Sequence, residues 1–179
     1  MKGIIIAILS LLLISTAFAA DLSKFPEMFI EDGTANVLVI VGKAAKAEDV
    51  LGAVDIVVVL QHAAGNKKLD IAKMDDEVDV LSAQNSIIIG GPCANPAAAA
   101  IMYPNGAPDN CGEDFTAGEA MIKYYENGDN VALLVAGYSA EDTRRAGKIL
   151  GNYANYDLSG SEVVVKGTTL TDMTVTKVA

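Results

Sequence analysis

The segment Gly137-Tyr138-Ser139-Ala140-Glu141 comes nearest to a catalytic motif. A serine between two glycines, placed between a strand and a helix, is the nucleophile elbow of many hydrolases. Here Glu141 replaces the second glycine, and the only histidine that could activate the serine is His62, inside a predicted apolar helix. Ser139 and Asp142 also fit a helix capping box. We therefore expect Ser139 to cap a helix and expect no catalytic residue, with a serine hydrolase as the less favoured alternative.

Glycines end two of the predicted buried strands, at Gly42 and at Gly90-Gly91. The carboxyl ends of strands are where open α/β sheets bind ligands. However, neither segment extends to a dinucleotide-binding or phosphate-binding glycine motif. Tight turns are the favoured interpretation, and no cofactor is assigned. The alternative is an extracellular module that binds a small ligand or glycan at these strand ends, with Gly137 and Ser139 as further ligand or turn positions.

Two cysteines, Cys93 and Cys111, lie in the middle of the chain. Two thiols in an oxidising compartment normally pair, so we predict a disulfide. Closing a loop of this length stabilises a fold by about 3 kcal/mol in the chain-entropy model. A structural zinc site is a poorer interpretation, because it needs four ligands and the sequence has a single histidine.

The charge of the chain is strongly acidic, with 23 Asp and Glu against 13 Lys and Arg and a formal net charge of −10. Such a surface disfavours nucleic acid and offers no basic patch for anionic lipid. An acidic cluster occurs in a polar stretch, residues 65–85, but it lacks EF-hand spacing. We expect this stretch to be a solvated loop and predict no metal site from it.

Short apolar runs predict the strands, at 37–41, 87–89, 131–135, 163–165 and 173–176. Residues 119–126 and 131–136 flank Asn127-Gly128-Asp129-Asn130, which predicts a hairpin whose second arm is central in the sheet. The hydrophobic spacing in 46–62 favours a helix, a shorter one follows Pro96, and residues 103–118 read as a loop.

The predicted helix after Ser139 runs to about Leu150 and ends at Gly151. Its spacing places Ala146, Ile149 and Leu150 inward, and Arg144, Arg145 and Lys148 outward. Strands that alternate with helices indicate an α/β fold. We expect a Rossmann-like three-layer sandwich with a mostly parallel sheet plus a β-hairpin.

The start of the chain has the three parts of a secretory signal peptide: Lys2, the apolar run 4–14, and Ala17-Phe18-Ala19. We predict cleavage after Ala19. A pilin-type leader cut after Gly3 is the alternative. No other apolar run reaches the roughly 18 residues of a membrane-spanning helix, so no transmembrane anchor is expected after cleavage.

Several segments together resemble the archaeal S-layer protein family. They cover most of the expected mature chain in the family's order: Val37–Gly42 with Ala47-Glu48-Asp49-Val50, Ile87–Pro96, Val131–Ala146 and Leu158–Val165. The resemblance implies a secreted, non-catalytic cell-envelope protein whose partners are other envelope proteins or itself. It also implies that Ca²⁺ is an open alternative, without an assigned site.

The resemblance departs in length, because S-layer proteins of this kind usually run to several hundred residues. We therefore expect a signal peptide at 1–19, an N-terminal extension at 20–36 and one S-layer-like α/β domain at 37–179. A structural or interaction role at the cell surface is the function that this sequence predicts.

Overall fold

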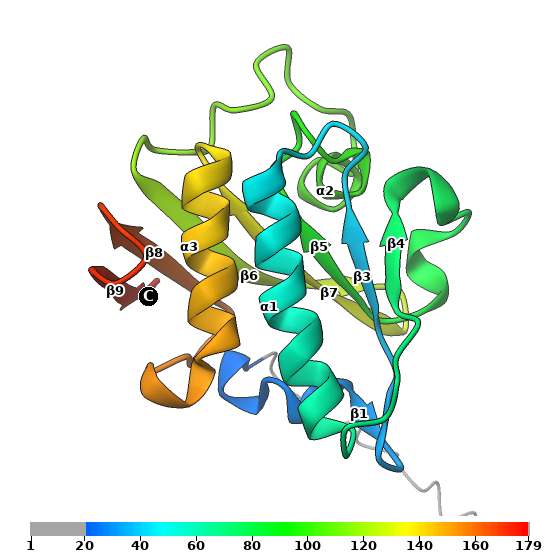
Figure 1. Cartoon of the computed structure of the whole chain (residues 1–179). Coiled ribbons are helices and arrows are strands. Elements are labelled where there is room, and N and C mark those ends of the chain that lie inside the picture. Colours follow the sequence, from blue (N-terminus) through cyan, green and yellow to red (C-terminus); the bar gives the residue numbers. More distant parts are fainter. Residues whose placement is uncertain (1–20, 179) are drawn as a thin grey trace, which may run out of the picture.

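The computed structural model describes residues 21–178, and the expected signal peptide lies outside them. Seven strands form one sheet in the order β4-β3-β5-β7-β6-β8-β9 (Figure 1). Their bounds are β3 (Leu38–Val41), β4 (Ala72–Met74), β5 (Ser86–Ile89), β6 (Glu119–Asn127), β7 (Asn130–Gly137), β8 (Glu162–Gly167) and β9 (Met173–Lys177). The predicted strands are thus present, and β7 occupies the central position.

The sheet is mixed rather than mostly parallel in its pairing. Strands β4, β3, β5 and β7 pair in parallel, whereas β7-β6, β6-β8 and β8-β9 pair antiparallel. Strand β8 consequently runs in the same direction as β7, and only β6 and β9 run against the others. Short connections explain two of these antiparallel pairs, β6-β7 and β8-β9, because a tight turn cannot return a chain for parallel pairing.

The predicted hairpin between residues 119–126 and 131–136 is confirmed. Asn127 faces Asn130 across the end of the β6-β7 ladder. Gly128 in the turn has a φ of +67°, a left-handed conformation that glycine adopts without strain. The two-residue connection therefore fixes the register of both arms.

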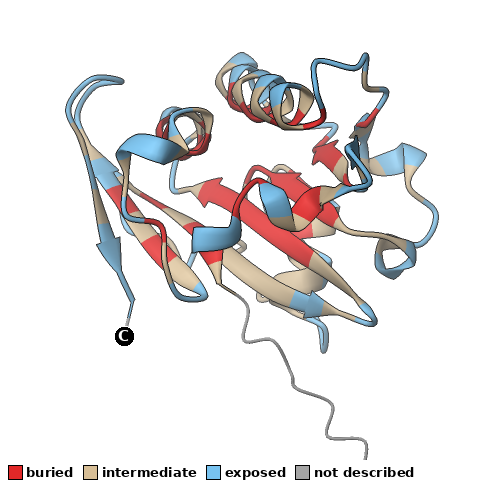
Figure 2. Ribbon diagram, turned by 90° about the horizontal axis from the view of Figure 1, so that it is seen from below, coloured by how far each residue is buried: buried red, intermediate tan, exposed pale blue. Residues whose placement is uncertain are grey.

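Helices cover both faces of the sheet. Helices α1 (Ala47–Ala63) and α3 (Ala140–Gly151) lie side by side on one face, and α2 (Pro96–Met102) lies on the other (Figure 1). A methyl group on Gly147 would lie 2.6 Å from the Cα of Gly52, so α1 and α3 cross with their backbones almost in contact. Buried residues gather along the sheet and on the helix sides that face it (Figure 2).

The segment 21–36 packs into the same core as the strands. It contains two short 3₁₀ turns and a separate hairpin of β1 (Ile30–Glu31) and β2 (Thr34–Ala35). Leu22, Phe25 and Phe29 are at most 2 % exposed. The ring of Phe25 also meets Tyr153 edge to face at 5.7 Å. The residues that we described as an extension thus contribute large side chains to the interior.

Two expectations need correction. The polar stretch 65–85 contains strand β4 and two 3₁₀ turns, so it is not simply a solvated loop. Arg145 does not point outward: it is 8 % exposed and binds the buried carboxylate of Asp142. Arg144 lies across α1 and donates to the Leu51 carbonyl at 2.9 Å, whereas the inward positions Ala146, Ile149 and Leu150 are confirmed.

Candidate functional site

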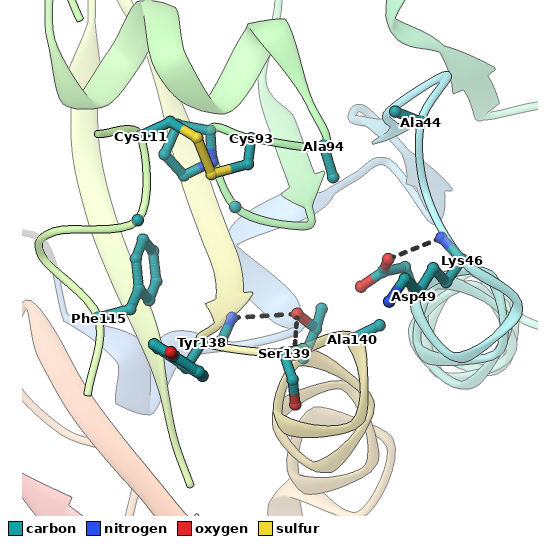
Figure 3. Close-up of a pocket in the computed structure, with 15 residues that line it drawn as sticks. Ala44, Lys46, Asp49, Cys93, Ala94, Cys111, Phe115, Tyr138, Ser139 and Ala140 are labelled. Carbon is teal, nitrogen blue, oxygen red and sulfur yellow. Dashed lines mark hydrogen bonds between the residues drawn. A yellow bond between two sulfur atoms is a disulfide. The ribbon is translucent and has the colours of Figure 1, made fainter. Parts of the chain in front are cut away.

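The carboxyl ends of β3, β5 and β7 meet at an open cleft of about 280 Å³ (Figure 3). The segment after β3 contributes Lys46 and Asp49, and the segment after β5 contributes Gly91–Ala94. The turn after β7 contributes Gly137–Ala140, and the loop between α2 and β6 covers the cleft with Phe115. This is the edge of the sheet at which α/β folds bind ligands.

The predicted disulfide forms one wall of this cleft. Cys93 and Cys111 are bonded, with their Cα atoms 5.3 Å apart. The bond fastens the loop 103–118 to the end of β5, and so it holds Phe115 close to Gly91. Within that loop, the Tyr103 hydroxyl donates to Asp114 at 2.7 Å. Burial, together with the acceptor and charge of Asp114, raises the pKa of Tyr103 to about 12.

Ser139 is confirmed as the N-cap of α3. Its Oγ accepts from the Asp142 amide at 3.2 Å and donates to Asp142 Oδ2 at 2.6 Å. The Ser139 amide donates to the same carboxylate at 3.0 Å. Both polar atoms of the serine are therefore occupied by the capping box that the sequence predicted.

His62 does not come near Ser139. It lies exposed in the last turn of α1, whereas the cleft lies beside the first turn. A helix of 17 residues is about 25 Å long, so the imidazole and the Ser139 hydroxyl lie at opposite ends of the helical layer. The hydrolase alternative is consequently left without its histidine base.

The four glycines of interest divide into two pairs. Gly91 and Gly137 line the cleft, whereas Gly42 and Gly90 do not. A methyl group on Gly42 would lie 2.0 Å from the Ala94 carbonyl oxygen, and one on Gly137 would lie 2.4 Å from the Asp142 Cβ. Gly90 has a φ of +95°. Gly42 and Gly137 are thus explained by close packing that leaves no space for a Cβ atom. Gly90 is explained by a backbone conformation that residues with side chains rarely adopt.

Asn95 is a structural residue that the sequence analysis did not single out. Its fully buried side-chain amide donates to the Ile40 carbonyl at 3.2 Å and to the Ile89 carbonyl at 2.9 Å. The side-chain oxygen accepts from the Ala97 amide and caps α2. One asparagine therefore ties the ends of β3 and β5 to the next helix. The only sequence signal for it is the Asn-Pro pair at a helix start.

The electrostatics of the cleft do not favour an anionic ligand. Asp49 accepts from the Lys46 amide at 2.9 Å at the start of α1, just as Asp142 accepts from the Ser139 amide at the start of α3. Both carboxylates are at most 3 % exposed. The positive end of each helix dipole already has a negative partner, and one of these two carboxylates, Asp49, lines the cleft. The exposed ring of Tyr138, with Phe115 beside it, instead suits an uncharged polar ligand.

The acidic cluster is engaged in local contacts. Lys43 Nζ lies 2.6 Å from Asp76, and this hydrogen bond lowers the pKa of the Asp76 carboxyl. Asp75 accepts from the Lys43 amide, and Glu77 accepts from the Met74 amide. Across residues 21–178, no group of three or more His, Cys, Asp and Glu side chains is placed to hold a metal ion.

An exposed apolar surface on α1 is the largest feature that sequence reasoning missed. The spacing of Val50 and Val54 suggested the helix correctly, but these residues face solvent while Ile56 and Leu60 face the core. Four exposed side chains, here called the valine face, are 46–58 % accessible: Val50, Leu51, Val54 and Val58. Hydrophobic residues on all sides of α1 gave no signal for which side is buried.

Comparison with protein families gives a match over most of the described chain. A sequence model of the S-layer-like family, outer domain, matches residues 21–66 and 61–154. No curated protein matches the chain. Within the part of the chain that the structure describes, no helix is both long and apolar enough to cross a bilayer. The family match indicates a structural protein of the cell surface.

Proposed function

Because the chain belongs to the S-layer-like family, we propose that it is exported and acts without catalysis as a structural or interaction protein of the cell envelope. The observation that carries this proposal is the family match from residue 21 to residue 154. The archaeal source implied by the resemblance is part of the same proposal. The partners would be other envelope proteins or further copies of the chain.

Three features support export. The first 19 residues have the pattern of a signal peptide. The Cys93–Cys111 disulfide belongs to an oxidising compartment. The chain is acidic, with a net charge of −10, and this charge disfavours binding to anionic lipid.

Two features support a role without catalysis. Ser139 is engaged in the capping box, and His62 lies far from it. Close backbone packing accounts for the glycine at the end of β3, since a methyl group on Gly42 would lie 2.0 Å from the Ala94 carbonyl oxygen. A fold of this kind can act through contacts between its surface and other proteins, as a coat protein does.

Fractionation of cells that produce the chain tests the proposal. We expect a product that starts at Ala20, with the disulfide intact, in the envelope fraction. The matched control carries Leu11→Arg and Leu12→Arg, which interrupt the apolar run of the leader and should retain the chain in the cytosol. An uncleaved wild-type chain in the cytosol, with free thiols, would overturn the proposal. Extraction of envelopes with and without a chelator would reveal a dependence on divalent cations.

A second candidate function is the binding of a glycan in the cleft by a Rossmann-like module. The observation that favours it is the 59 % exposure of Tyr138 beside Phe115, since aromatic rings commonly stack on sugars. Titration calorimetry with envelope oligosaccharides should then show binding that Tyr138→Ala abolishes. Glu126→Ala, an exposed change far from the cleft, serves as the control. Equal heats for both variants would reject this candidate.

A further inference from the structure

The outer side of α1 is unusual for a helix at the surface of a sheet. A surface helix normally presents polar residues to solvent. Helix α3 does so, with Glu141 exposed and Lys148 half-buried on its outer side. Helix α1, which lies beside it, exposes the valine face instead. Val50, Val54 and Val58 are four residues apart and form a continuous ridge along the helix.

A groove runs along this ridge, between α1 and the edge strand β4. It has a volume of about 340 Å³, and Val41 and Ala53 are among the residues that line it. Val54 and Val58 line one side, and Ala72 and Met74 line the other. Met74 is 37 % exposed. The molecule therefore carries an apolar ridge and an apolar groove side by side.

We propose that the valine face binds a second copy of this chain, with the two α1 helices antiparallel about a two-fold axis near Val54. In an isologous contact the same patch is used by both copies, so the ridge of each copy enters the groove of the other. Ridges formed by residues four apart pack into such grooves in helix pairs. This contact would be one of the self-contacts of the proposed function. It rests on that proposal only for the location of the chain at the cell surface.

The charges at the two ends of the groove select the antiparallel arrangement. Glu77 lines the end near the start of α1, next to Asp75 and the Lys43–Asp76 pair. Lys67 and Lys68 follow the other end of α1 and are exposed, and Lys67 Nζ also donates to the Gly33 carbonyl at 2.6 Å. Lys73, which also lines the groove, lies 3.8 Å from Asp70 and is largely balanced by it. An antiparallel pair brings the acidic end of one copy to the basic end of the other, whereas a parallel pair brings like charges together. Antiparallel helix dipoles also oppose each other favourably.

The size of the contact sets its expected strength. Helix α1 is about 25 Å long, so the strip with its groove and charged ends falls at the small end of specific interfaces. We expect a dissociation constant on the order of 10 µM for the purified chain in solution. Such a contact would form readily at the high local concentration of a surface coat.

Sedimentation of the mature chain from about 1 µM to about 1 mM tests the association. We expect a monomer–dimer equilibrium that Val54→Lys weakens at least about tenfold, as does the milder Val58→Ser. Ala100→Lys, a change at an exposed position of α2 on the other face of the sheet, should leave it unchanged. Circular dichroism shows that each variant is folded. A wild-type chain that stays monomeric at 1 mM would overturn the inference.

Disulfide trapping tests the direction of the helices. Val54→Cys lies near the axis and should form a dimer with itself. Ala47→Cys and Gln61→Cys lie seven residues to either side, so each alone should give little dimer and their mixture should give a mixed dimer. Self-trapping of Gln61→Cys, with none in the mixture, would indicate parallel helices and overturn the inference. Envelope fractionation of Val54→Lys separates the two proposals: a monomeric chain that still reaches the envelope rejects only the dimer.

Discussion

Close packing at Gly42 is the strictest requirement for a single residue in this fold. A side-chain methyl at this position would lie 2.0 Å from the Ala94 carbonyl oxygen and 2.7 Å from the Asn95 Cα. Because both obstacles are backbone atoms, they cannot move without separating the ends of β3 and β5. The glycine is therefore explained by packing, with no need for a ligand.

Gly42→Ala should accordingly lower the free energy of unfolding by about 3 kcal/mol, measured by urea denaturation. Gly112→Ala is the matched control, because a methyl there meets its neighbours only at 3.8 Å and beyond. It should change stability by less than about 1 kcal/mol. Equal effects of the two substitutions would mean that the junction of β3 and β5 yields more easily than its contacts indicate.

Tyr103 gives a residue-scale prediction for pH. Its pKa in the folded chain is about 12, above the ordinary value of about 10. A phenol with a raised pKa contributes stability that is complete below about pH 10 and is lost as the pH rises through about 12. Tyrosinate absorbance should show one group titrating near 12 that disappears in Tyr103→Phe. Asp114→Asn should lower that pKa part of the way, because burial raises it as well.

The position of the loop 103–118 depends on the Cys93–Cys111 disulfide. It contains no strand and no helix, and the Cys93–Cys111 bond joins it to the end of β5. The Tyr103–Asp114 hydrogen bond is its main internal contact between side chains. The disulfide therefore shapes one wall of the cleft.

Replacing both cysteines by serine should lower the free energy of unfolding by about 3 kcal/mol, measured by thermal or urea denaturation. The wild-type chain under a strong reductant should show the same loss. A variant as stable as the oxidised chain would mean that the loop holds its position without the bond.

The elements also show how far sequence reasoning reaches. The start of α3 was predictable because Ser139 and Asp142 act within one turn, and the β6-β7 hairpin because its turn is four residues long. Strand β4 was not, because Ala72-Lys73-Met74 has no β-branched or aromatic residue and is a strand only through its pairing with β3. The burial of Arg145 depends on α3 packing against β8, which no local pattern encodes.

The cleft was predictable only in part. Gly91, Gly137 and Ser139 were recognised from their places after strands, and the disulfide from the number of cysteines. Phe115 and Lys46 come from distant segments, so nothing in their own neighbourhoods marks them. The exposed side of α1 could not be predicted, because Val54 and Ile56 are both apolar and the packing of α1 against the sheet and α3 decides which one is covered.

At the scale of the whole molecule, the segment 21–36 is part of the fold's interior. Phe29 is 1 % exposed and packs in the same core as α1 and α3. A large buried ring of this kind typically contributes several kcal/mol.

Phe29→Ala should therefore lower the free energy of unfolding by about 3–5 kcal/mol, again by denaturation. Phe115→Ala, the same change at the half-buried position over the cleft, should cost clearly less. If Phe29→Ala were the milder of the two, residues 21–36 would be a peripheral appendage after all.

The contact between Asp21 and Gly160 links the first residues that the structure describes to a turn far along the chain. The Gly160 amide donates to the Asp21 carboxylate across 139 residues of sequence, and the Leu22 amide donates to the Gly160 carbonyl at 2.8 Å. During synthesis the contact cannot form until Gly160, which lies just before β8, has left the ribosome. Until then Phe25 and Phe29 lack it. Contacts between residues so far apart in sequence form slowly. We therefore expect these aromatic side chains to stay accessible to chaperones for most of the synthesis of the chain.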